Sequence, residues 1–272
     1  MQLTLNARPL IEVRVEEAIR RLKEYEPEEG YYLAFSGGKD SIVIYDLAVR
    51  AGVKFDAHFH KTTVDPPEVV KFIRDNYPGV KWDKPRKSMF KLIEEHKFLP
   101  TRWRRYCCTY LKEMHGTGKT TILGVRRAES VKRANRQVFE ESRRNRNTYF
   151  LCPIVDWSTD DVWQYIRMNH LQYPSLYDEG YTRIGCIMCP LQGTKGMLTD
   201  AERYPKYYRA YLRAIERMLD ALRAEGKDIT ITRGRTAEEL MYWWIHNADK
   251  DLETPQVELT TVDGKDPEDA HP

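Results

Sequence analysis

The sequence predicts an α/β protein with a doubly wound, mostly parallel sheet and a helical C-terminal portion. Apolar runs of strand length alternate with amphipathic stretches in the N-terminal part of the 272-residue chain, an order that is typical of parallel sheets. One apolar run leads directly into a Gly-Gly turn and then into an amphipathic stretch. Long amphipathic stretches without strand candidates make up the C-terminal part. In such sheets, ligands bind at the carboxyl ends of the strands.

The strands are expected where β-favouring apolar residues lie between turn residues. The clearest case runs from Tyr31 to Phe35, directly after Gly30. A Gly-Thr-Gly-Lys turn at 116–119 leads into another candidate. In chain order the expected strands are 31–35, 55–60, 80–83, 121–125 and 149–155.

The helices are expected where apolar residues recur at a spacing of three or four. Ile11, Val15 and Leu22 show this spacing in the first helix. Proline begins one later helix, and Ser158 or Thr159 supplies the N-cap oxygen of another. In chain order the expected helices are 8–24, 41–52, 66–77, 88–97, one that follows residue 158, 200–223 and 236–247.

Three parts of the chain are expected. Residues 1–195 form a nucleotide-binding domain that also carries the paired cysteines, and residues 196–248 form the helical portion. Residues 249–272 contain eight acidic and only two basic residues, which predicts a loosely held acidic tail. No apolar run is long enough to span a bilayer, and the N-terminus lacks the apolar core of a signal peptide. We therefore expect a cytoplasmic protein with no membrane partner.

A phosphate-binding loop is indicated by the six residues that join the first strand to the next helix. They are Ser36-Gly37-Gly38-Lys39-Asp40-Ser41. Glycines let the backbone approach phosphate oxygens closely, while a helix N-terminus and a lysine both favour an anion. The alternative is an ordinary strand–turn–helix corner. The loop is not a Walker A motif, because no glycine lies five positions before Gly38; a second candidate at 116–120 fails because position 113 is Glu113.

The six-residue signature resembles the PP-loop of the adenine nucleotide α-hydrolase-like superfamily, which has a Rossmann-like fold. Its members bind ATP or a sulfonucleotide and commonly split ATP between the α and β phosphates. The resemblance implies that Ser36, Gly38 and Ser41 hold the terminal phosphates. It implies that Lys39 contributes a fixed charge, and that Asp40 helps to place Mg²⁺ or orients the loop.

The cysteines form two pairs and one single residue. Cys107 and Cys108 are adjacent, Cys186 and Cys189 form C-x-x-C, and Cys152 lies in a strand candidate. Two such pairs suit a Cys₄ site for zinc or for an iron–sulfur cluster. The contiguous pair favours a [4Fe–4S] cluster, because a cubane has separate irons for two neighbouring thiolates. The alternative is that the adjacent pair packs in the interior and only C-x-x-C acts, as a redox pair; Cys152 is expected in the core.

The order of these motifs resembles the phosphoadenosine/adenosine phosphosulfate reductase family. The match covers the phosphate loop, the segment 105–112 around the adjacent cysteines, and G-x-R-x-x-E-S-x-x-R at 124–133. It continues with P-I-x-x-W-x-x-x-D-V-W at 153–163 and G-C-x-x-C-P at 185–190. The resemblance implies that Cys107, Cys108, Cys186 and Cys189 bind a [4Fe–4S] cluster near the nucleotide.

Arginines after the fourth expected strand supply further anion-binding candidates. Arg126, Arg127 and Arg133 carry guanidinium groups that suit phosphate or sulfate oxygens. The segment 126–146 holds eight basic residues against three glutamates. It is either a solvated helix with ion pairs or a surface that contacts a polyanion.

The resemblance is incomplete at the reactive thiol. Sulfonucleotide reductases attack the sulfonate with a cysteine in an E-C-G-x-H-like segment, and the residues after Cys189 contain no cysteine. The S-G-G-K-D-S form of the loop is also typical of ATP users. Similar sequences occur in the sulfur-inserting ATP pyrophosphatases of DNA phosphorothioation and in tRNA thiolation enzymes.

The sequence is therefore interpreted as an iron–sulfur ATP pyrophosphatase that activates an acceptor for sulfur transfer. Lys39, Asp40 and Arg126 are the catalytic candidates, and [4Fe–4S], ATP and Mg²⁺ are the expected cofactors. The expected partners are a nucleotide, a sulfur donor protein such as a cysteine desulfurase or thiol carrier, and a nucleic-acid acceptor. One alternative is a sulfonucleotide reductase whose thiol comes from a partner or from Cys152. Another is an iron–sulfur sensor that binds a nucleotide without turnover.

Overall fold

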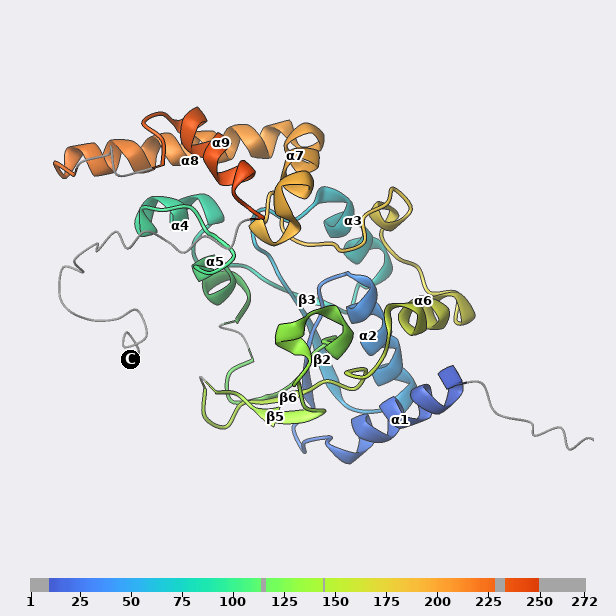
Figure 1. Ribbon diagram of the computed structural model, residues 1–272. Helices are drawn as coiled ribbons and strands as arrows, with labels where there is room; N and C mark the ends of the chain where they lie inside the picture. Colours follow the sequence, from blue (N-terminus) through green and yellow to red (C-terminus); the bar gives the residue numbers. More distant parts are fainter. Residues whose placement is uncertain (1–9, 114–115, 144, 228–232, 250–272) are drawn as a thin grey trace, which may run out of the picture. The chain divides into compact units, whose positions relative to one another are not determined.

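The computed structural model describes residues 10–113, 116–143, 145–227 and 233–249. It divides the chain into two compact units (Figure 1). The first unit comprises Met1–Met89 and Tyr106–Ile187, and the second comprises Phe90–Arg105 and Met188–Pro272. The sequence predicts a domain boundary at residue 195. In the structure, residues 90–105 also belong to the unit of the C-terminal helices. The expected acidic tail lies, after Asp249, outside the described residues.

The first unit is built on a six-stranded sheet with the order β3-β2-β1-β4-β6-β5. All neighbouring strands are parallel except β5, which is antiparallel to β6. The order extends in both directions from β1, so the sheet is doubly wound and the predicted fold class is confirmed. The strands are β1 (Tyr31–Ala34), β2 (Phe55–His60), β3 (Lys81–Asp83), β4 (Thr120–Ile122), β5 (Phe139–Glu141) and β6 (Tyr149–Leu151).

Two strands are shorter than their apolar runs predict. β4 ends at Ile122 and β6 ends at Leu151. After β6 the chain turns within the core, where Val155 N–H donates to the Cys152 carbonyl at 3.2 Å. Cys152, Ile154 and Val155 are fully buried in this turn. Hydrophobic pattern alone does not separate a buried turn from a buried strand.

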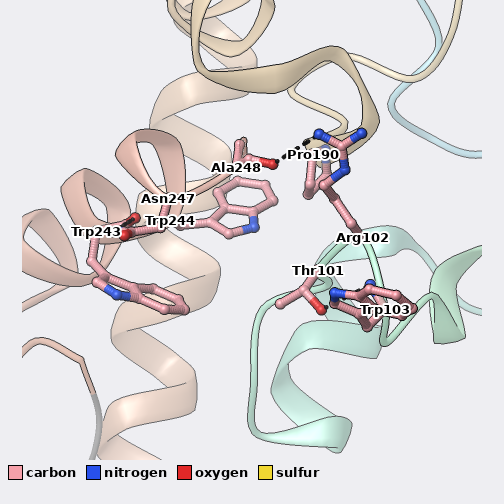
Figure 2. A pocket seen from close by; sticks show the side chains of 8 residues that line it. All are labelled: Thr101, Arg102, Trp103, Pro190, Trp243, Trp244, Asn247 and Ala248. Atoms are coloured by element: carbon pink, nitrogen blue, oxygen red, sulfur yellow. Dashed lines mark hydrogen bonds between the residues drawn. The ribbon is translucent and has the colours of Figure 1, made fainter. Parts of the chain in front are cut away.

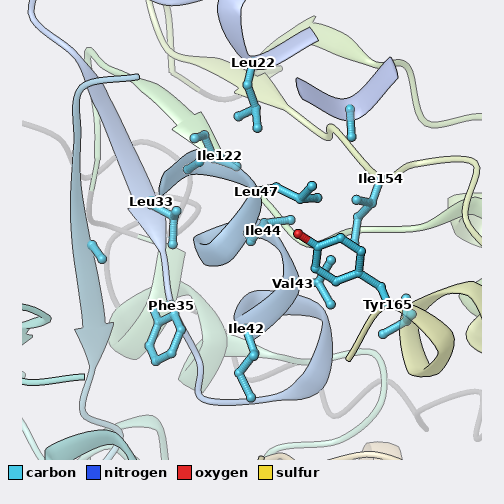
Figure 3. Packing of buried hydrophobic residues seen from close by; sticks show 14 of the residues in the cluster. Leu22, Leu33, Phe35, Ile42, Val43, Ile44, Leu47, Ile122, Ile154 and Tyr165 are labelled. Carbon is cyan, nitrogen blue, oxygen red and sulfur yellow. The ribbon is translucent and has the colours of Figure 1, made fainter. Parts of the chain in front are cut away.

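Helices α1 (Leu10–Glu24), α2 (Lys39–Ala51) and α6 (Thr159–Met168) pack together in the first unit. Their apolar faces form one core with the sheet (Figure 3). Leu33 from β1, Ile44 from α2 and Ile122 from β4 are each completely buried in this core. Packing therefore fixes α2, and with it the loop at its N-terminus. Helix α3 (Pro67–Asn76) adds Val69, Phe72 and Ile73 to the same core.

Polar contacts fix the chain between β6 and α6. The Arg21 guanidinium makes two hydrogen bonds of 2.9 Å to the Asp156 carboxylate and one of 2.9 Å to the Pro153 carbonyl. Burial alone would raise the pKa of Asp156, but the hydrogen bond and charge of Arg21 lower it below its usual value. Of the two N-cap candidates, Ser158 is the N-cap of α6, and it forms a capping box with Asp161.

Short helical turns fill the remaining connections of the first unit. The adjacent cysteines lie in α5 (Tyr106–Cys108), which continues into the π-helix η1 (Thr109–Glu113). The basic segment 126–146 forms no α-helix in its described residues. It contains the 3₁₀ turns η2 (Arg127–Glu129) and η3 (Val131–Arg133), and then β5. A further 3₁₀ turn, η4 (Ser175–Tyr177), follows α6.

The second unit is helical. It contains most of α4 (Met89–His96), the turn η5 (Pro190–Gln192), α7 (Gly193–Arg203), α8 (Pro205–Ala224) and α9 (Ala237–His246). The single helix expected at 200–223 is interrupted at Tyr204, because Pro205 cannot donate a backbone hydrogen bond and restricts the residue before it. The Trp244 indole N–H donates to the Pro100 carbonyl at 2.7 Å, which ties 90–105 to α9. Within the described residues, no helix is long and apolar enough to cross a membrane.

Candidate functional site

The loop Ser36–Ser41 lies at the carboxyl end of β1, directly before α2. β1 ends at Ala34, Gly38 is the N-cap of α2, and the helix begins at Lys39. β1 is the strand from which the sheet order extends in both directions, and the carboxyl edge at this point is where doubly wound sheets bind ligands. The first backbone N–H groups of α2 have no acceptor within their own helix and favour an anion.

Glycine is required at position 37. Gly37 has a φ of 72°, which falls in the left-handed region that other residues rarely adopt. A Cβ at this position would lie 2.8 Å from Ile73 Cδ1, an atom of the buried core. The loop therefore passes closely over α3, and a side chain at Gly37 would displace it.

Two serine hydroxyl groups lie together at the N-terminus of α2. Ser36 Oγ donates to Ser41 Oγ at 3.2 Å, and Ser41 Oγ donates to the Gly38 carbonyl at 2.8 Å. Gly38 N–H donates to Ser36 Oγ at 3.3 Å. The structure thus brings together the serines that the sequence assigns to phosphate.

Lys39 is buried in this site, with only 6% of its surface exposed. Its Nζ lies 3.2 Å from Asp40 Oδ2 and donates to the Thr182 carbonyl at 3.4 Å. Its backbone N–H donates to the Tyr177 hydroxyl at 2.9 Å. The lysine charge is therefore held beside the helix N-terminus by partners from its own loop and from 177–182.

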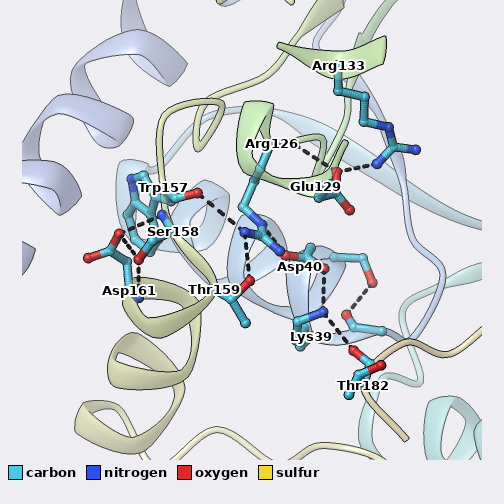
Figure 4. A network of polar contacts seen from close by, with 12 residues as sticks. Lys39, Asp40, Arg126, Glu129, Arg133, Trp157, Ser158, Thr159, Asp161 and Thr182 are labelled. Carbon is cyan, nitrogen blue, oxygen red and sulfur yellow. Dashed lines mark hydrogen bonds and ion pairs between the residues drawn. The ribbon is translucent and has the colours of Figure 1, made fainter. Parts of the chain in front are cut away.

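Asp40 is held by a buried arginine (Figure 4). Arg126 Nε donates to Asp40 Oδ1 at 2.7 Å, and Arg126 is only 2% exposed. The same guanidinium donates through Nη1 to the Trp157 carbonyl at 3.3 Å and to Thr159 Oγ1 at 3.4 Å. Asp40 thus lies between the cations of Lys39 and Arg126, and Arg126 connects the loop to the start of α6.

Gly124 allows this connection to form. A Cβ on Gly124 would lie 3.0 Å from the carbonyl carbon of Asp40 and 3.1 Å from the Asp40 Cβ. The chain after β4 therefore passes against the first turn of α2, and this close approach explains the glycine that begins the segment 124–133.

The other two arginine candidates lie nearer the surface. Arg127 is exposed, and its Nε donates to the Arg136 carbonyl at 2.8 Å. Arg133 pairs with Glu129, whose carboxylate also accepts the Arg126 backbone N–H at 3.0 Å. The structure therefore places Arg126 within the loop network, whereas Arg127 and Arg133 belong to the turns beside it.

Sequence reasoning missed the contribution of 177–182 to the site. Burial raises the pKa of Tyr177, so its hydroxyl keeps its proton while it accepts the Lys39 N–H. Thr182 contributes only a backbone carbonyl. Neither role has a sequence signal, because each depends on where η4 and the chain after it pack.

The cysteines are all thiols without disulfide bonds. Cys107, Cys108 and Cys186 belong to the first unit and Cys189 to the second. Cys186 Sγ lies 3.5 Å from the buried Thr62 Oγ1. In the part of the chain that the structure describes, no group of three or more His, Cys, Asp or Glu side chains is arranged to hold a metal ion. The expectation of a [4Fe–4S] cluster therefore rests on the sequence pattern alone.

Cys152 lies in the core, as expected. It is fully buried, and burial raises the pKa of its thiol to about 11. The thiolate is the nucleophilic form of cysteine, so this residue is poorly suited to attack a substrate.

Comparison with known proteins identifies relatives of this chain. The family model for the phosphoadenosine phosphosulfate reductase domain matches residues 30–192. An uncharacterized protein of Methanocaldococcus jannaschii is 30% identical over 66% of this chain, and the chain spans only 40% of that protein. An adenosine 5′-phosphosulfate reductase of Oceanobacillus iheyensis is 31% identical over 63% of this chain and 75% of the enzyme. The crystal structure of a phosphoadenylyl-sulfate reductase from Candida auris in complex with phosphate has a TM-score of 0.49 and 19% identity, over 68% of this chain and 97% of that one.

Replacing Asp40 by asparagine is expected to lower the free energy of unfolding by about 3–5 kcal/mol, because the buried Arg126 charge then lacks its counter-ion. Urea unfolding measures the change. Asp75→Asn is the matched control, since Asp75 forms an exposed ion pair with Lys71 on α3 and its loss should change stability by less than about 1 kcal/mol.

Adding Arg126→Met to Asp40→Asn should restore part of the lost stability, because the uncompensated Arg126 charge is then removed and only the Lys39 charge remains. Equal stability of Asp40→Asn and Asp75→Asn would contradict the assignment of a buried, compensated pair.

Cys152 is expected to resist alkylation by iodoacetamide at about pH 8.5, where an ordinary thiol is half ionised. Its folded-state pKa is raised to about 11, so the folded protein favours the neutral thiol, and ionisation at higher pH opposes folding. Mass spectrometry of the native and urea-unfolded protein measures the labelling. Rapid modification of Cys152 in the native protein would contradict its burial.

Proposed function

This chain belongs to the phosphoadenosine phosphosulfate reductase family, and we propose that within it the chain acts as an ATP pyrophosphatase that adenylates an acceptor for sulfur transfer. The observation that carries this proposal is the complete loop Ser36–Ser41 at the N-terminus of α2. It combines two hydroxyl groups, a buried lysine and helix N–H groups at one carboxyl edge. Such a set suits a chain of phosphates better than it suits a neutral ligand.

In the proposed complex the loop holds the β and γ phosphates. Ser36 and Ser41 donate hydroxyl protons to phosphate oxygens, and Lys39 supplies a positive charge. The Tyr177 hydroxyl accepts from the Lys39 backbone N–H, and the Thr182 carbonyl and the Asp40 carboxylate accept from its ammonium group. Phosphate oxygens that bind Lys39 would replace these partners.

The proposed reaction is a displacement at the α phosphorus. An acceptor oxygen forms a bond to the α phosphorus while the bond to the bridging oxygen of pyrophosphate breaks. The acceptor proton passes to solvent, and the negative charge develops on pyrophosphate. Lys39 and the N-terminus of α2 stabilise that charge, which is greater in the transition state than in bound ATP.

Asp40 acts by orienting the loop. Its two carboxylate oxygens face Lys39 and Arg126, so its charge is already compensated and it is poorly placed to ligate a metal. Mg²⁺ that arrives with ATP would neutralise the phosphates.

The cysteines bear on the alternative function, a sulfonucleotide reductase. Relatives named adenosine 5′-phosphosulfate reductase, among them the Oceanobacillus protein, support that alternative. A reductase needs an accessible thiolate, and Cys152 is buried with a raised pKa. The residues that follow Cys189 in this chain contain no further thiol. Sulfite formation would therefore require a thiolate other than Cys152.

We further propose, from the cysteine pattern, that Cys107, Cys108, Cys186 and Cys189 hold a [4Fe–4S] cluster. When bound, the cluster would supply a fixed polarising charge and join the segments that carry the two pairs. The sulfur itself would come from a donor protein, such as a cysteine desulfurase or a thiol carrier.

Purified protein is expected to release pyrophosphate from ATP when an acceptor is present, and to release AMP only when a sulfur donor then displaces it from the adenylated acceptor. It should form no sulfite from adenosine phosphosulfate with a thiol reductant.

Lys39→Ala should weaken ATP binding by roughly 10- to 150-fold, because it removes a charge-assisted contact of about 1.5–3 kcal/mol. Calorimetry measures the affinity. The control is Lys71→Ala, whose lysine side chain is 77% exposed on α3. Unchanged ATP affinity in Lys39→Ala would show that the loop is only a strand–turn–helix connection and binds no phosphate. Catalytic sulfite production by the wild-type protein would favour the reductase.

Anaerobically purified protein is expected to contain iron and acid-labile sulfide in equal amounts. Each single Cys→Ser change at 107, 108, 186 or 189 should lower both, whereas Cys152→Ser should retain them. Iron, sulfide and zinc analysis decides the matter, and stoichiometric zinc without sulfide would exclude the cluster.

A further inference from the structure

A turn in the second unit holds a tryptophan in solvent. Thr101 N–H donates to the Arg104 carbonyl at 3.1 Å, and Thr101 Oγ1 accepts the backbone N–H groups of Trp103 at 3.3 Å and Arg104 at 3.0 Å. Trp103 lies within this turn and is 55% exposed. Three hydrogen bonds thus order the backbone of the turn that carries this exposed ring. Exposed aromatic rings on ordered backbone are typical of recognition surfaces.

The exposed ring borders a pocket that the turn shares with α9 (Figure 2). Trp243 and Trp244 of α9, and Asn247 at its C-cap, line it together with Arg102 and Trp103. The hollow has an empty volume of about 290 Å³, which includes space open to solvent. The Trp103 ring, which is 55% exposed, can therefore be reached from solvent.

The walls of the pocket are fixed by the core of the second unit. The Trp244 indole donates to the Pro100 carbonyl, immediately before the turn. The Trp244 ring packs on Tyr211 of α8, with centroids 5.3 Å apart. The pocket therefore needs little ordering before it binds a ligand, which favours affinity.

Arginines surround these rings. Arg102, Arg104 and Arg105 flank Trp103 in sequence, and the Arg233 guanidinium lies 6.0 Å from the Trp243 ring centroid. The Arg102 guanidinium donates to the Ala248 carbonyl at 3.5 Å and lies 3.9 Å from the Asp249 carboxylate. Arg104 lies over the Phe98 ring at 5.2 Å. Arg102 thus lines the pocket itself, and the other arginines lie next to its residues in the sequence or over an aromatic ring.

We propose that this pocket, named here the Trp103 pocket, binds single-stranded nucleic acid. One base stacks on an exposed indole, and Arg104 and Arg105 contact the neighbouring phosphates. A base joined to a phosphate combines a planar ring with a nearby negative charge, which is the complement of Trp103 and its flanking arginines. An acidic protein would match the charge but would leave the indole rings without planar partners.

The nucleic-acid binding is independent of the nucleotide chemistry, because its residues all belong to the second unit. Only the further statement that the bound strand is the acceptor rests on the proposed function. The two can be tested separately, since Lys39 and Trp103 lie in different units.

The test uses the full-length chain and fluorescein-labelled single-stranded RNA and DNA of one mixed sequence, followed by fluorescence anisotropy. Trp103→Ala should weaken binding by roughly 5- to 150-fold, the range for loss of one stacked base. The Arg104→Gln/Arg105→Gln variant should weaken binding and lower its dependence on salt, because fewer counter-ions are released. Comparison of RNA with DNA shows which strand is preferred.

The matched control is Tyr242→Ala, which removes another exposed aromatic ring of the second unit, 65% exposed on α9 and outside the pocket lining. It should leave the affinity unchanged, as should Lys39→Ala, while Trp103→Ala should leave ATP binding unchanged. The proposal is overturned if wild-type protein binds neither strand at low salt, or if Trp103→Ala binds like wild type. It is also overturned if polyglutamate competes as well as unlabelled RNA does, since the surface would then select charge alone.

Discussion

The ion pair between Asp40 and Arg126 is the contact on which the arrangement of the loop depends. It joins the first turn of α2 to the chain after β4, and Arg126 extends the connection to Trp157 and Thr159 at the start of α6. Because Arg126 is almost completely buried, neither partner can be removed alone without leaving an uncompensated charge. Lys39, placed on the other side of Asp40, keeps its position through the same carboxylate.

The contacts around the Asp40–Arg126 pair show that several residues of the family motifs contact other parts of the protein. Gly124 permits close approach to Asp40, and Asp156 is held by Arg21. Asp161 completes the capping box of α6. Gly124 thus contacts the loop, whereas Asp156 and Asp161 fix the chain around the start of α6. Much of the motif between 124 and 163 therefore has a structural role. In the proposed complex, the residues that contact phosphate are the serines, Lys39 and the N–H groups at the start of α2.

The two proposed activities use different chemistry in different units. The first unit offers a compact anion site on a rigid sheet edge, suited to small phosphates. The second offers the exposed indole ring of Trp103 beside arginines, which suits a flexible strand whose bases are unpaired. An enzyme that adenylates a nucleic acid needs both kinds of site, because ATP and the nucleic acid are both negatively charged but differ in size and shape.

The sequence by itself determined the fold class, the position of the phosphate loop and the burial of Cys152, because these follow from local patterns: apolar periodicity, a Gly-Gly turn after a strand and an isolated cysteine in an apolar run. It also placed the helix N-cap at Ser158 or Thr159, and the cap at Ser158 involves residues only three apart. Only the tertiary structure decided that Arg126 holds Asp40, that Tyr177 and Thr182 engage Lys39, and that 90–105 joins the C-terminal helices. Those contacts connect residues far apart in the chain, and their partners are selected by packing and burial, which local sequence does not encode.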